Sequence, residues 1–444
     1  ESLDVPPTLV SFAVSMTKAS KTLSASVKEP GSTLVLLPIP EDENGMPDWE
    51  ALKAYYRAVL LHIDCGDIVS AGVVREGGAA ATVLRMCFGE ETGFRFAEGL
   101  TKETLYAPQE GALVVELSSE ADLSADPALA PVVLGHSTSK GDVKLGGEKI
   151  SMEELCAAWM GTLEKIFPNN APRVPVAADV PLWEKRERRA PAIKVAKPRV
   201  FIPAFPGTNC EVDSARAFEK AGAETEILVV KNLSPKDIEE TIGRMEQAIR
   251  RAQIIIIATT FRNPKVAQAV TDLLETRDGL MLGICNGFQA LIKLGLVPYG
   301  KITEPKEDDP TLTFNTLGRH VSRMVYTRVT SVKSPWMAGV HAGDIHAVPV
   351  SHGEGRFVAD EKALKKLIEN GQIATQYVDP DGTVSGDIQW NPNGSVCGIE
   401  GITSPDGRVL GKMGHSERKG QDLYKNVPGA KDQWLFESGV KYFK

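Results

Sequence analysis

Gly283-Ile284-Cys285-Asn286-Gly287 places a cysteine between two glycines, directly after an apolar run. A nucleophile on a sharp strand-to-helix turn crowds the residues two positions before and after it, and glycine relieves that crowding. A helix that starts just after the cysteine favours thiolate, the reactive form of the side chain. The pattern predicts a nucleophile elbow in which Cys285 attacks an electrophilic carbon.

A cysteine nucleophile needs a base, and His415 is the best candidate among the seven histidines. Glu417 follows two residues later, and in extended chain residues i and i+2 face the same way, so its carboxylate can orient the imidazole. Taken alone, His-x-Glu also fits a surface histidine beside an incidental acid. Its position after the elbow favours the base, and we predict a triad of Cys285, His415 and Glu417.

Ser351-His352-Gly353-Glu354-Gly355 also places an acid two residues after a histidine. Its paired glycines favour backbone brought close to a ligand, so we interpret it as a loop that cradles substrate rather than as the base. Cys210 either borders the site or packs the helix that follows it, and packing is the preferred interpretation. His320, His341 and His346 show no metal-ligand spacing, so no metal site is predicted.

From residue 199 the chain alternates apolar strands with amphipathic helices. Such alternation predicts a parallel sheet covered on both faces, with ligands bound at the carboxyl edge where Cys285 lies. We therefore expect an α/β, flavodoxin-like domain over residues 199–444. Its expected strands are 200–205, 224–230, 253–258 and 280–284, and its expected helices are 211–221, one from 234, 263–274 and one after 284.

Residues 1–167 mix strands and helices without that regular alternation, which predicts a separate α+β domain. β-rich runs cover 8–17, 32–39 and 68–74, Asp48 caps an amphipathic helix, the turn 75–78 enters a helix over 79–87, and a capping box at 151–154 opens a helix toward 167. Residues 168–198 carry six prolines and a charge run at 184–189. We interpret them as a solvated interdomain linker.

The composition excludes several classes of protein. A length of 444 residues predicts two to three domains, and a net charge of −8 offers no attraction to nucleic acid or to an anionic membrane surface. No apolar run approaches the roughly 20 residues that span a bilayer. The six cysteines form no CxxC pair, so neither a zinc site nor a disulfide framework is expected, and a cytoplasmic location fits best.

The motifs G-I-C-N-G-F-Q and M-G-H-S-E-R resemble those of the class I, or triad, glutamine amidotransferases. Further phrases are similar to the phosphoribosylformylglycinamidine synthase family, at residues 205–211, 315–319, 351–355 and 391–395. Residues 1–167 resemble the carboxyl-terminal half of that family's synthetase module, which is like aminoimidazole ribonucleotide synthetase, with the turn at 75–78 in the expected place. The resemblance covers essentially the whole chain.

This resemblance implies roles for individual residues. Cys285 would attack the carboxamide of glutamine, His415 would act as acid and base, and Glu417 would orient the imidazole. Glutamine would be held by Gln289, Ser351, His352 and Gly353, and the N–H of Asn286 would stabilise the oxyanion. The released ammonia would then amidate formylglycinamide ribonucleotide to formylglycinamidine ribonucleotide in the synthetase portion, a step that uses ATP and Mg²⁺.

The family's large single-chain form carries two synthetase modules before the glutaminase. The resemblance therefore implies that this chain, which starts with an acidic segment and no Met, is a C-terminal fragment or one piece of a split enzyme, with the upstream synthetase portion as its partner. One departure is the lack of a Gly-Gly-Phe loop after Ala258, which would remove an oxyanion donor. The other is Gly414 and Ser416, where the family usually has proline, which changes backbone stiffness.

Two other functions remain open at the level of the sequence. One is a freestanding Cys-His hydrolase of γ-glutamyl or peptide substrates, although such an enzyme has no use for half a nucleotide-synthetase module. The other is a catalytically silent scaffold that keeps the elbow without an oxyanion loop. Alkylation of Cys285 by a glutamine analogue separates the active alternatives from the silent one.

Overall fold

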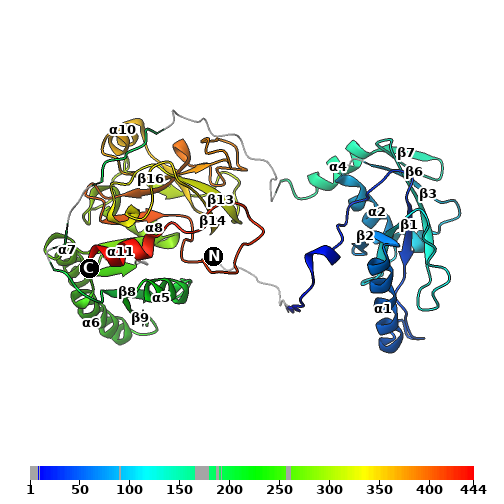
Figure 1. The fold of residues 1–444 in the computed structure, drawn as a ribbon, viewed down its shortest axis with the longest axis horizontal. Coiled ribbons are helices and arrows are strands. Elements are labelled where there is room, and N and C mark those ends of the chain that lie inside the picture. Colours follow the sequence, from blue (N-terminus) through cyan, green and yellow to red (C-terminus); the bar gives the residue numbers. More distant parts are fainter. Residues whose placement is uncertain are drawn as a thin grey trace. The chain divides into compact units, whose positions relative to one another are not determined.

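The computed structural model describes residues 9, 11–89, 92–165, 180–186, 190–191, 193–256 and 262–444. The chain forms two compact units, Glu1–Lys165 and Ile166–Lys444, and each is described by itself (Figure 1).

The elements of the first unit follow the order η1 (Ala19–Lys21), β1 (Thr33–Leu37), α1 (Trp49–Cys65), β2 (Ile68–Val73), α2 (Gly78–Phe88), β3 (Gly93–Phe96), α3 (Lys102–Tyr106), β4 (Leu113–Leu117), β5 (Val132–Thr138), β6 (Asp142–Leu145), β7 (Glu148–Ser151) and α4 (Met152–Gly161). The strands form one sheet in the order β2-β4-β1-β5-β3-β6-β7. All of its pairings are antiparallel except that of β3 with β6.

Both faces of the first sheet are covered, as the sequence of its strands requires. Successive side chains of a strand point to opposite faces. In β1, Leu34 and Leu36 pack in the core that contains α2, whereas Val35 and Leu37 pack in the core that contains α1. The four apolar side chains of β1, Leu34 to Leu37, are all buried because apolar cores lie on both faces of the sheet at this strand.

The start signals of the helices act as their residue types predict. Asp48 caps α1 by accepting hydrogen bonds from the N–H groups of Glu50 and Ala51, and the Ser151 hydroxyl caps α4 by accepting from Glu154 N at 3.1 Å. The expected strand over residues 8–17 is wrong for the residues that the structure describes there. They pair with no other strand, and Phe12 stays 88% exposed, so the backbone lacks the partner that a strand needs.

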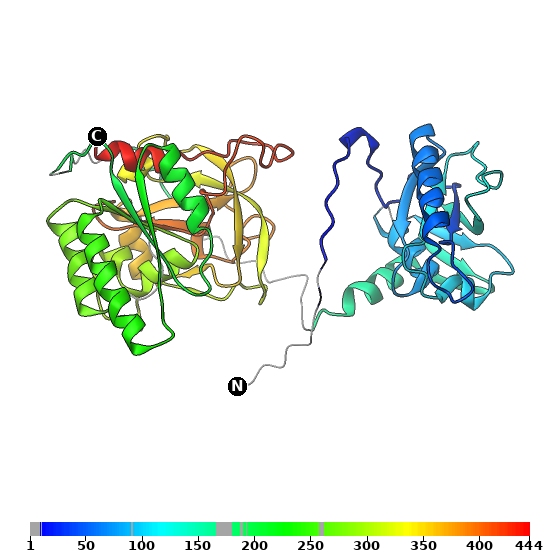
Figure 2. The ribbon, with the colours of Figure 1, turned by 90° about the horizontal axis from the view of Figure 1, so that it is seen from below.

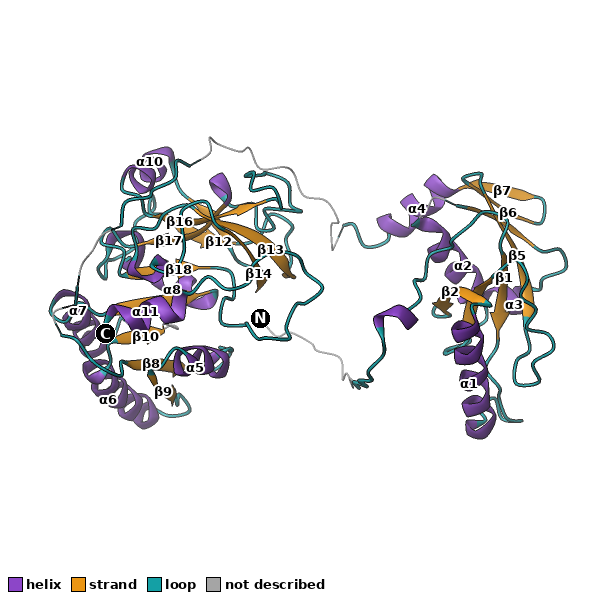
Figure 3. Cartoon of the chain, in the orientation of Figure 1, coloured by secondary structure: helices purple, strands orange, loops and turns teal. Residues whose placement is uncertain are grey.

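The elements of the second unit are β8 (Arg199–Ala204), α5 (Glu211–Lys220), β9 (Glu224–Val229), α6 (Pro235–Arg251), β10 (Ile254–Ile256), α7 (Pro264–Glu275), β11 (Leu280–Ile284), α8 (Asn286–Lys293), α9 (Leu296–Tyr299), β12 (Thr311–Thr313), β13 (Val321–Val329), η2 (Pro335–Met337), β14 (Ile345–His352), β15 (Arg356–Val358), α10 (Glu361–Glu369), β16 (Ile373–Val378), η3 (Val396–Gly398), β17 (Ile399–Thr403), β18 (Val409–Lys412) and α11 (Leu435–Tyr442). Figure 3 distinguishes the helices, strands and loops.

The main sheet of this unit has a parallel and an antiparallel half. Its strand order is β14-β13-β16-β17-β18-β11-β10-β8-β9. Strands β9, β8, β10, β11 and β18 run parallel, whereas β17, β16, β13 and β14 continue the sheet with antiparallel pairings. The expected α/β class is confirmed, and the antiparallel strands extend the sheet beyond its parallel part.

Helices cover both faces of the parallel half, which Figure 2 shows edge on. Phe201, Ile255 and Met281 pack in the core that includes α6, α7 and α8. On the other face, strand residues such as Ile202 and Leu282 pack in the core that includes α5 and α11. This burial on two sides explains why the strands are continuously apolar, and it leaves the carboxyl edge of the sheet for the loops that follow each strand.

The described part of the expected linker is largely exposed, as expected, but it is anchored to the second unit at several points. Trp183 N donates to Thr330 O at 2.8 Å, the Arg186 guanidinium donates to Met337 O at 3.0 Å and to Val340 O at 2.5 Å, and Val180 is buried in the core of the second unit. Backbone carbonyls of the second unit and an apolar contact therefore hold residues 180–186. Within the range 168–192, residues 168–179, 187–189 and 192 lie outside the described residues.

Within the described ranges, none of the helices combines the length and the apolar character that crossing a lipid bilayer requires.

Candidate active site

Cys285 lies on a sharp turn between β11 and α8. Its backbone angles are φ 53° and ψ −107°, which a non-glycine residue adopts only under strain. A Cβ atom at Gly283 would come within 2.6 Å of the Gly287 carbonyl group. The glycine before the cysteine is therefore needed for the close approach between strand end and helix start, as in a nucleophile elbow.

The thiol of Cys285 is buried beside hydrogen-bonding groups of the turn and of a neighbouring loop. Its Sγ lies 3.7 Å from Ser351 O and 4.0 Å from the Asn286 side-chain oxygen. Burial raises the pKa of the Cys285 thiol to about 11, the Asn286 backbone N–H lowers it, and the nearby Glu417 raises it. The thiol is therefore neutral at pH 7, and a base must take its proton when it attacks.

We predict that alkylation of Cys285 by iodoacetamide, in the absence of glutamine, becomes about tenfold faster per pH unit between pH 7 and pH 9, because only the thiolate reacts. With a pKa near 11, about one thiol in ten thousand is ionised at pH 7, and this fraction rises until the pH passes the pKa. Mass spectrometry of the tryptic peptide that contains Cys285 measures the rate. A plateau below pH 8 would contradict the prediction.

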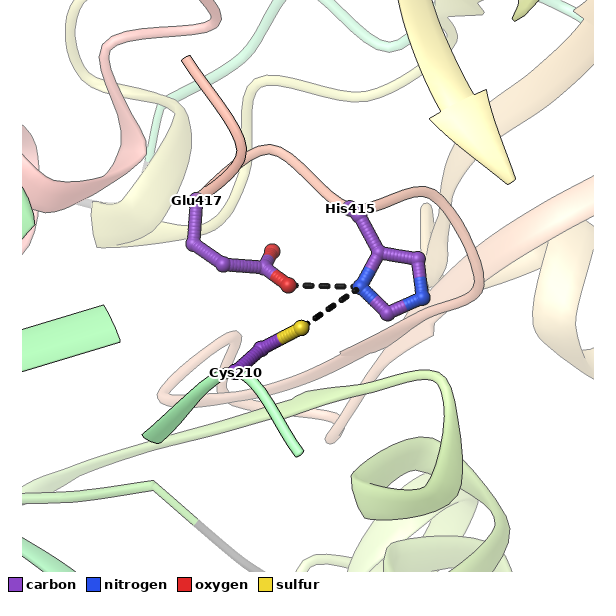
Figure 4. Close-up of side chains that lie close together, drawn as sticks. All are labelled: Cys210, His415 and Glu417. Atoms are coloured by element: carbon purple, nitrogen blue, oxygen red, sulfur yellow. Dashed lines mark hydrogen bonds and ion pairs between the residues drawn. The ribbon is translucent and has the colours of Figure 1, made fainter. Parts of the chain in front are cut away.

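His415 and Glu417 form a buried pair. Glu417 Oε1 lies 2.5 Å from His415 Nδ1 (Figure 4). The backbone N–H of His415 donates to Pro349 O at 2.8 Å. His415 Nε2 and Glu417 Oε2 are buried and have no hydrogen-bond partner among the described residues. A carboxylate that holds one ring nitrogen leaves the other free to exchange a proton with a substrate or a nucleophile.

Cys210 lies at this pair as well, and not in the packing role preferred from the sequence. It precedes α5 with a φ of 66°, and the Arg418 guanidinium donates to its Sγ from Nε at 3.2 Å and from Nη2 at 3.1 Å. The same Sγ is 4.0 Å from His415 Nδ1 (Figure 4). Cys210, Cys285, His415 and Glu417 line one small pocket.

The structure thus brings the three predicted triad residues to one pocket at the carboxyl edge of the sheet. In the described structure, the hydrogen bonds of Cys285 Sγ and those of the His415 ring are with other groups and not with each other. Catalytic hydrogen bonds are often long or poorly aligned without substrate and tighten when it binds.

The loop over residues 351–355 is held by two buried asparagines. Asn315 Nδ2 donates to His352 O at 2.9 Å, and Asn315 Oδ1 accepts from Gly355 N at 3.1 Å. Asn393 Nδ2 donates to Gly355 O at 2.9 Å, and its Oδ1 lies 2.7 Å from His352 Nε2. Both asparagines lie in sequence segments that resemble the family, at residues 315–319 and 391–395, but the sequence alone does not reveal that they hold this loop.

His352 points toward Asn393, and its environment keeps it neutral. Burial lowers the pKa of His352 to about 4, against a smaller opposite effect of the hydrogen bond with Asn393. A neutral imidazole bound to an amide serves to hold the loop. This agrees with its interpretation as part of a loop and not as the base.

The other predicted substrate residues lie around the same loop. Gln289 Nε2, from α8, donates to Glu354 O at 2.5 Å and so ties the loop to the elbow helix. The Ser351 hydroxyl pairs with His320 Nε2 at 3.1 Å, while Gly353 O accepts from Asn315 N at 2.9 Å. The feature that faces Cys285 is the Ser351 carbonyl, a backbone group whose position no side-chain pattern reveals.

A fully buried ion pair lies behind the segment that carries His415. Lys412 Nζ, at the end of β18, is 3.2 Å from Glu400 Oε1 on β17, and both side chains are 0% exposed. Glu400 Oε1 accepts from Gly414 N at 2.5 Å, and Lys412 Nζ donates to Gly414 O at 2.7 Å and to Ser416 Oγ at 2.9 Å. The ion pair thus binds both backbone polar groups of Gly414, the residue before His415.

The same contacts involve Gly414 and Ser416, the two positions at which the sequence departs from the family that it resembles. A Cβ atom at Gly414 would lie 2.8 Å from Val348 Cγ2 and 2.9 Å from Glu400 Oε1. The Ser416 hydroxyl donates to Gln433 Oε1 at 2.6 Å while it accepts from Lys412. In this chain, hydrogen bonds to buried charges supply the stiffness that proline rings would supply.

We predict that Gly414→Pro, a change toward the usual family residue, destabilises this chain. Proline has no N–H to donate to Glu400, and its ring occupies space that Val348 and Glu400 already fill. The expected loss is about 3 kcal/mol of unfolding free energy, measured by urea unfolding. The comparison variant is Gly414→Ala, which adds a Cβ atom but keeps the N–H. A proline at Gly243 is not a useful control, because it would break α6. A Gly414→Pro variant as stable as the unaltered chain would contradict the role given to this N–H.

The sequence lacks the family's Gly-Gly-Phe loop after Ala258, and residues 257–261, which follow β10, lie outside the described residues. The N–H of Asn286, the other oxyanion donor that the resemblance implies, lies at the start of α8 and lowers the pKa of the Cys285 thiol.

Within the part of the chain that the structure describes, one group of side chains has the spacing of a metal site. It consists of Cys210, His415 and Glu417, whose ligand atoms lie within 4.8 Å of one another. Thiolate, imidazole and carboxylate together suit Zn²⁺ and not Mg²⁺, which prefers oxygen ligands.

A larger cavity, of about 660 Å³, lies in the second unit between η2 and α11. Its lining includes Arg186, Lys333 and Trp434, but no cysteine or histidine. Nucleophile and base converge in the smaller pocket, so chemistry and not size identifies the candidate active site.

Comparisons with known proteins concern the second unit. A family model for the CobB/CobQ-like glutamine amidotransferase domain matches residues 197–443. The phosphoribosylformylglycinamidine synthase subunit PurQ of Methanococcus maripaludis is 35% identical over 232 residues, which are 51% of this chain and 84% of that protein. The same subunit of Aquifex aeolicus is 31% identical over 241 residues, 51% of this chain and 94% of that protein. Among solved structures, PurLQS from Thermotoga maritima has a TM-score of 0.39 and 24% identity, and covers 56% of this chain and 100% of that chain.

Proposed function

The chain belongs, through residues 197–443, to the CobB/CobQ-like glutamine amidotransferase family and within it to the glutaminases of phosphoribosylformylglycinamidine synthase, and we propose that Cys285, His415 and Glu417 are its catalytic triad. The chain accordingly takes part in the glutamine-dependent formation of formylglycinamidine ribonucleotide in purine biosynthesis, the reaction of a glutamine-hydrolysing ligase. The observation that carries the triad is the buried His415–Glu417 pair in the pocket of a strained cysteine elbow.

In the first step, Cys285 Sγ bonds to the carboxamide carbon of glutamine. The thiol is neutral at pH 7 because burial raises its pKa, so its proton passes to His415 as the carbon–sulfur bond forms. Glu417 keeps the imidazole in one orientation and stabilises the imidazolium. The negative charge that develops on the amide oxygen is stabilised by the Asn286 N–H at the start of α8.

In the second step, His415 returns the proton to the leaving nitrogen, the carbon–nitrogen bond breaks, and ammonia departs from a thioester on Cys285. Water then attacks the thioester carbon with His415 as base, which releases glutamate and restores the thiol. The buried pair of His415 and Glu417 suits this exchange, because a fixed ring can accept and return a proton without reorienting.

We place the glutamine chain against the loop at residues 351–353. The Ser351 carbonyl lies 3.7 Å from Cys285 Sγ, so a substrate on the nucleophile meets this backbone. Asn315 and Asn393 donate hydrogen bonds to the backbone of this loop, and Gln289 links the loop to α8. Gln289, Ser351, His352 and Gly353 then act in glutamine binding mainly by fixing this backbone, since the side chains of Gln289 and His352 are already hydrogen-bonded within the protein.

We propose that the first unit is part of the synthetase module. We also propose that the two domains of the chain comprise residues 1–167 and 199–444. The ATP-driven step needs ATP and Mg²⁺, and formylglycinamide ribonucleotide is the acceptor of ammonia. As the family resemblance implies, we propose that the synthetase portion of the enzyme, as the partner, supplies this chemistry. A cytoplasmic location remains a prediction from the sequence.

The decisive experiment measures glutamate release from glutamine by this chain alone, and by the chain mixed with the synthetase portion, ATP, Mg²⁺ and formylglycinamide ribonucleotide. We expect release in the mixture that requires an intact Cys285. Release from the chain alone at the same rate would favour a freestanding hydrolase over a coupled glutaminase. The absence of release in every mixture, together with a Cys285 that resists a glutamine-analogue alkylator, would favour the silent scaffold.

A further inference from the structure

We propose that Cys210, His415 and Glu417 form a binding site for a thiophilic divalent cation such as Zn²⁺, and that the cation binds without the nucleophile Cys285. Inhibition of glutamine hydrolysis by this cation rests on the proposed function, whereas binding itself does not. The site uses a second cysteine that the triad chemistry does not need.

The three side chains converge from two separate segments. Cys210 lies on the turn that enters α5, and His415 and Glu417 lie after β18, yet all three point to one spot in Figure 4. His415 Nδ1 is 4.0 Å from Cys210 Sγ and 2.5 Å from Glu417 Oε1, and the three ligand atoms lie within 4.8 Å of one another.

These separations are close to those of a tetrahedral zinc site. With Zn–S of about 2.3 Å and Zn–N and Zn–O of about 2.0–2.1 Å, neighbouring sulfur and nitrogen ligands stand about 3.6 Å apart and nitrogen and oxygen ligands about 3.3 Å. Cys210 Sγ must therefore approach His415 Nδ1 by about 0.4 Å, and the Glu417 carboxylate must retreat by about 0.8 Å. Side-chain rotations produce shifts of this size without moving the backbone.

The surroundings supply both burial and unused ligand capacity. His415 and Glu417 are 3% and 4% exposed, and Glu417 Oε2 lacks a partner among the described residues. Arg418 donates two hydrogen bonds to Cys210 Sγ, which holds the sulfur in place. A thiolate that accepts two hydrogen bonds keeps a further lone pair for a cation, and a thiolate and a carboxylate together balance the two positive charges of the cation.

The binding step is balanced by the loss of one proton. A neutral His415 carries its proton on Nδ1 when it donates to Glu417, and coordination at Nδ1 moves that proton to Nε2. The Cys210 thiol gives its proton to solvent, and a metal–sulfur bond forms. The ring nitrogen that Glu417 oriented is then occupied, and the imidazole in this state cannot take the proton of Cys285.

The test uses Co²⁺ as a spectroscopic probe for Zn²⁺ on the full chain. A cobalt–thiolate bond gives a charge-transfer band in the near ultraviolet, so the band reports a sulfur ligand directly and needs no enzyme activity. We expect the band in the unaltered chain and in Cys285→Ala, and its loss in Cys210→Ser. Cys65→Ser removes an exposed thiol in the other unit and is the matched control that keeps the band.

Competition with Zn²⁺ then gives affinities, and we expect Cys210→Ser to weaken Zn²⁺ binding at least about tenfold. Zn²⁺ should also raise the unfolding temperature of Cys285→Ala but not of Cys210→Ser, which additionally shows that each variant is folded. A band that survives in Cys210→Ser and disappears in Cys285→Ala would place the metal on the nucleophile and overturn the proposal. A chain without any band overturns it as well.

Inhibition is measured last, since it also depends on glutaminase activity. Zn²⁺ should reduce glutamate release, and a chelator should restore it. If the chain binds cobalt tightly but hydrolyses no glutamine, the result supports the metal site and contradicts only the proposed function. Failure of the metal site and failure of the proposed function are therefore distinguishable.

Discussion

Replacing Cys285 with alanine is expected to lower the rate of glutamine hydrolysis by roughly 10⁵- to 10⁶-fold, to below detection in a glutamate-release assay. The reason is that no other described thiol has the elbow geometry. Cys210 lies in the same pocket, but Arg418 holds its sulfur, and it begins α5 rather than following a strand end that faces the substrate loop. The remaining groups can bind glutamine but cannot form the thioester.

Variants of the neighbouring residues should give a graded series. Glu417→Gln keeps the size of the side chain but removes the charge that stabilises the imidazolium, so a loss of roughly 10⁴-fold is expected. Cys65→Ala, in the other unit, is the control and should retain full activity. Glutamate release that persists in Cys285→Ala would show that a different nucleophile operates, with Cys210 the first to test.

Replacing Lys412 with methionine is expected to destabilise the second unit strongly while it leaves the triad residues themselves intact. Removal of one partner leaves Glu400 buried with an uncompensated charge, which costs roughly 3–5 kcal/mol. For a unit of this size the melting temperature should fall by roughly 10 °C. Thermal unfolding followed by circular dichroism measures this, and Lys365→Met, in an exposed pair with Glu369, is the control with little expected change.

Lys412→Met should also impair the reaction and not only the fold. Lys412 holds Gly414 O and Ser416 Oγ on either side of His415, so its loss frees the segment that positions the base. Below the melting temperature we expect kcat to fall by at least about tenfold, with a smaller change in the KM for glutamine, because the 351–355 loop is held by other residues. Equal loss of stability without any change in kcat would assign Lys412 a purely structural role.

The double variant Lys412→Met with Glu400→Gln separates the charge from the shape of the network. Removing both charges leaves no uncompensated carboxylate. The loss of unfolding free energy in the double variant should therefore be smaller than the sum of the losses in the two single variants, by about 1 kcal/mol or more. Strict additivity would contradict a direct interaction between the two side chains.

The amino-acid sequence by itself determined the features that depend on neighbours along the chain. The alternation of apolar strands and helices, the cap at Asp48, the elbow at Cys285 and the His415–Glu417 pair are all encoded within a few residues, because propensity, capping and strand geometry act locally. The same local logic failed for residues 8–17, since a β-rich run forms a strand only when another strand is available to pair with it.

Only the tertiary structure decided which distant residues meet at the site. The register of β17 and β18 sets Lys412 opposite Gly401 and so within reach of the neighbouring Glu400. Asn315 and Asn393 reach the 351–355 loop from two other segments. Cys210 joins His415 because β8 and β18 end at the same edge of one sheet. The register and order of strands follow from the packing of the whole unit, so the contacts that complete the site have no signature in the local sequence around any one of these residues.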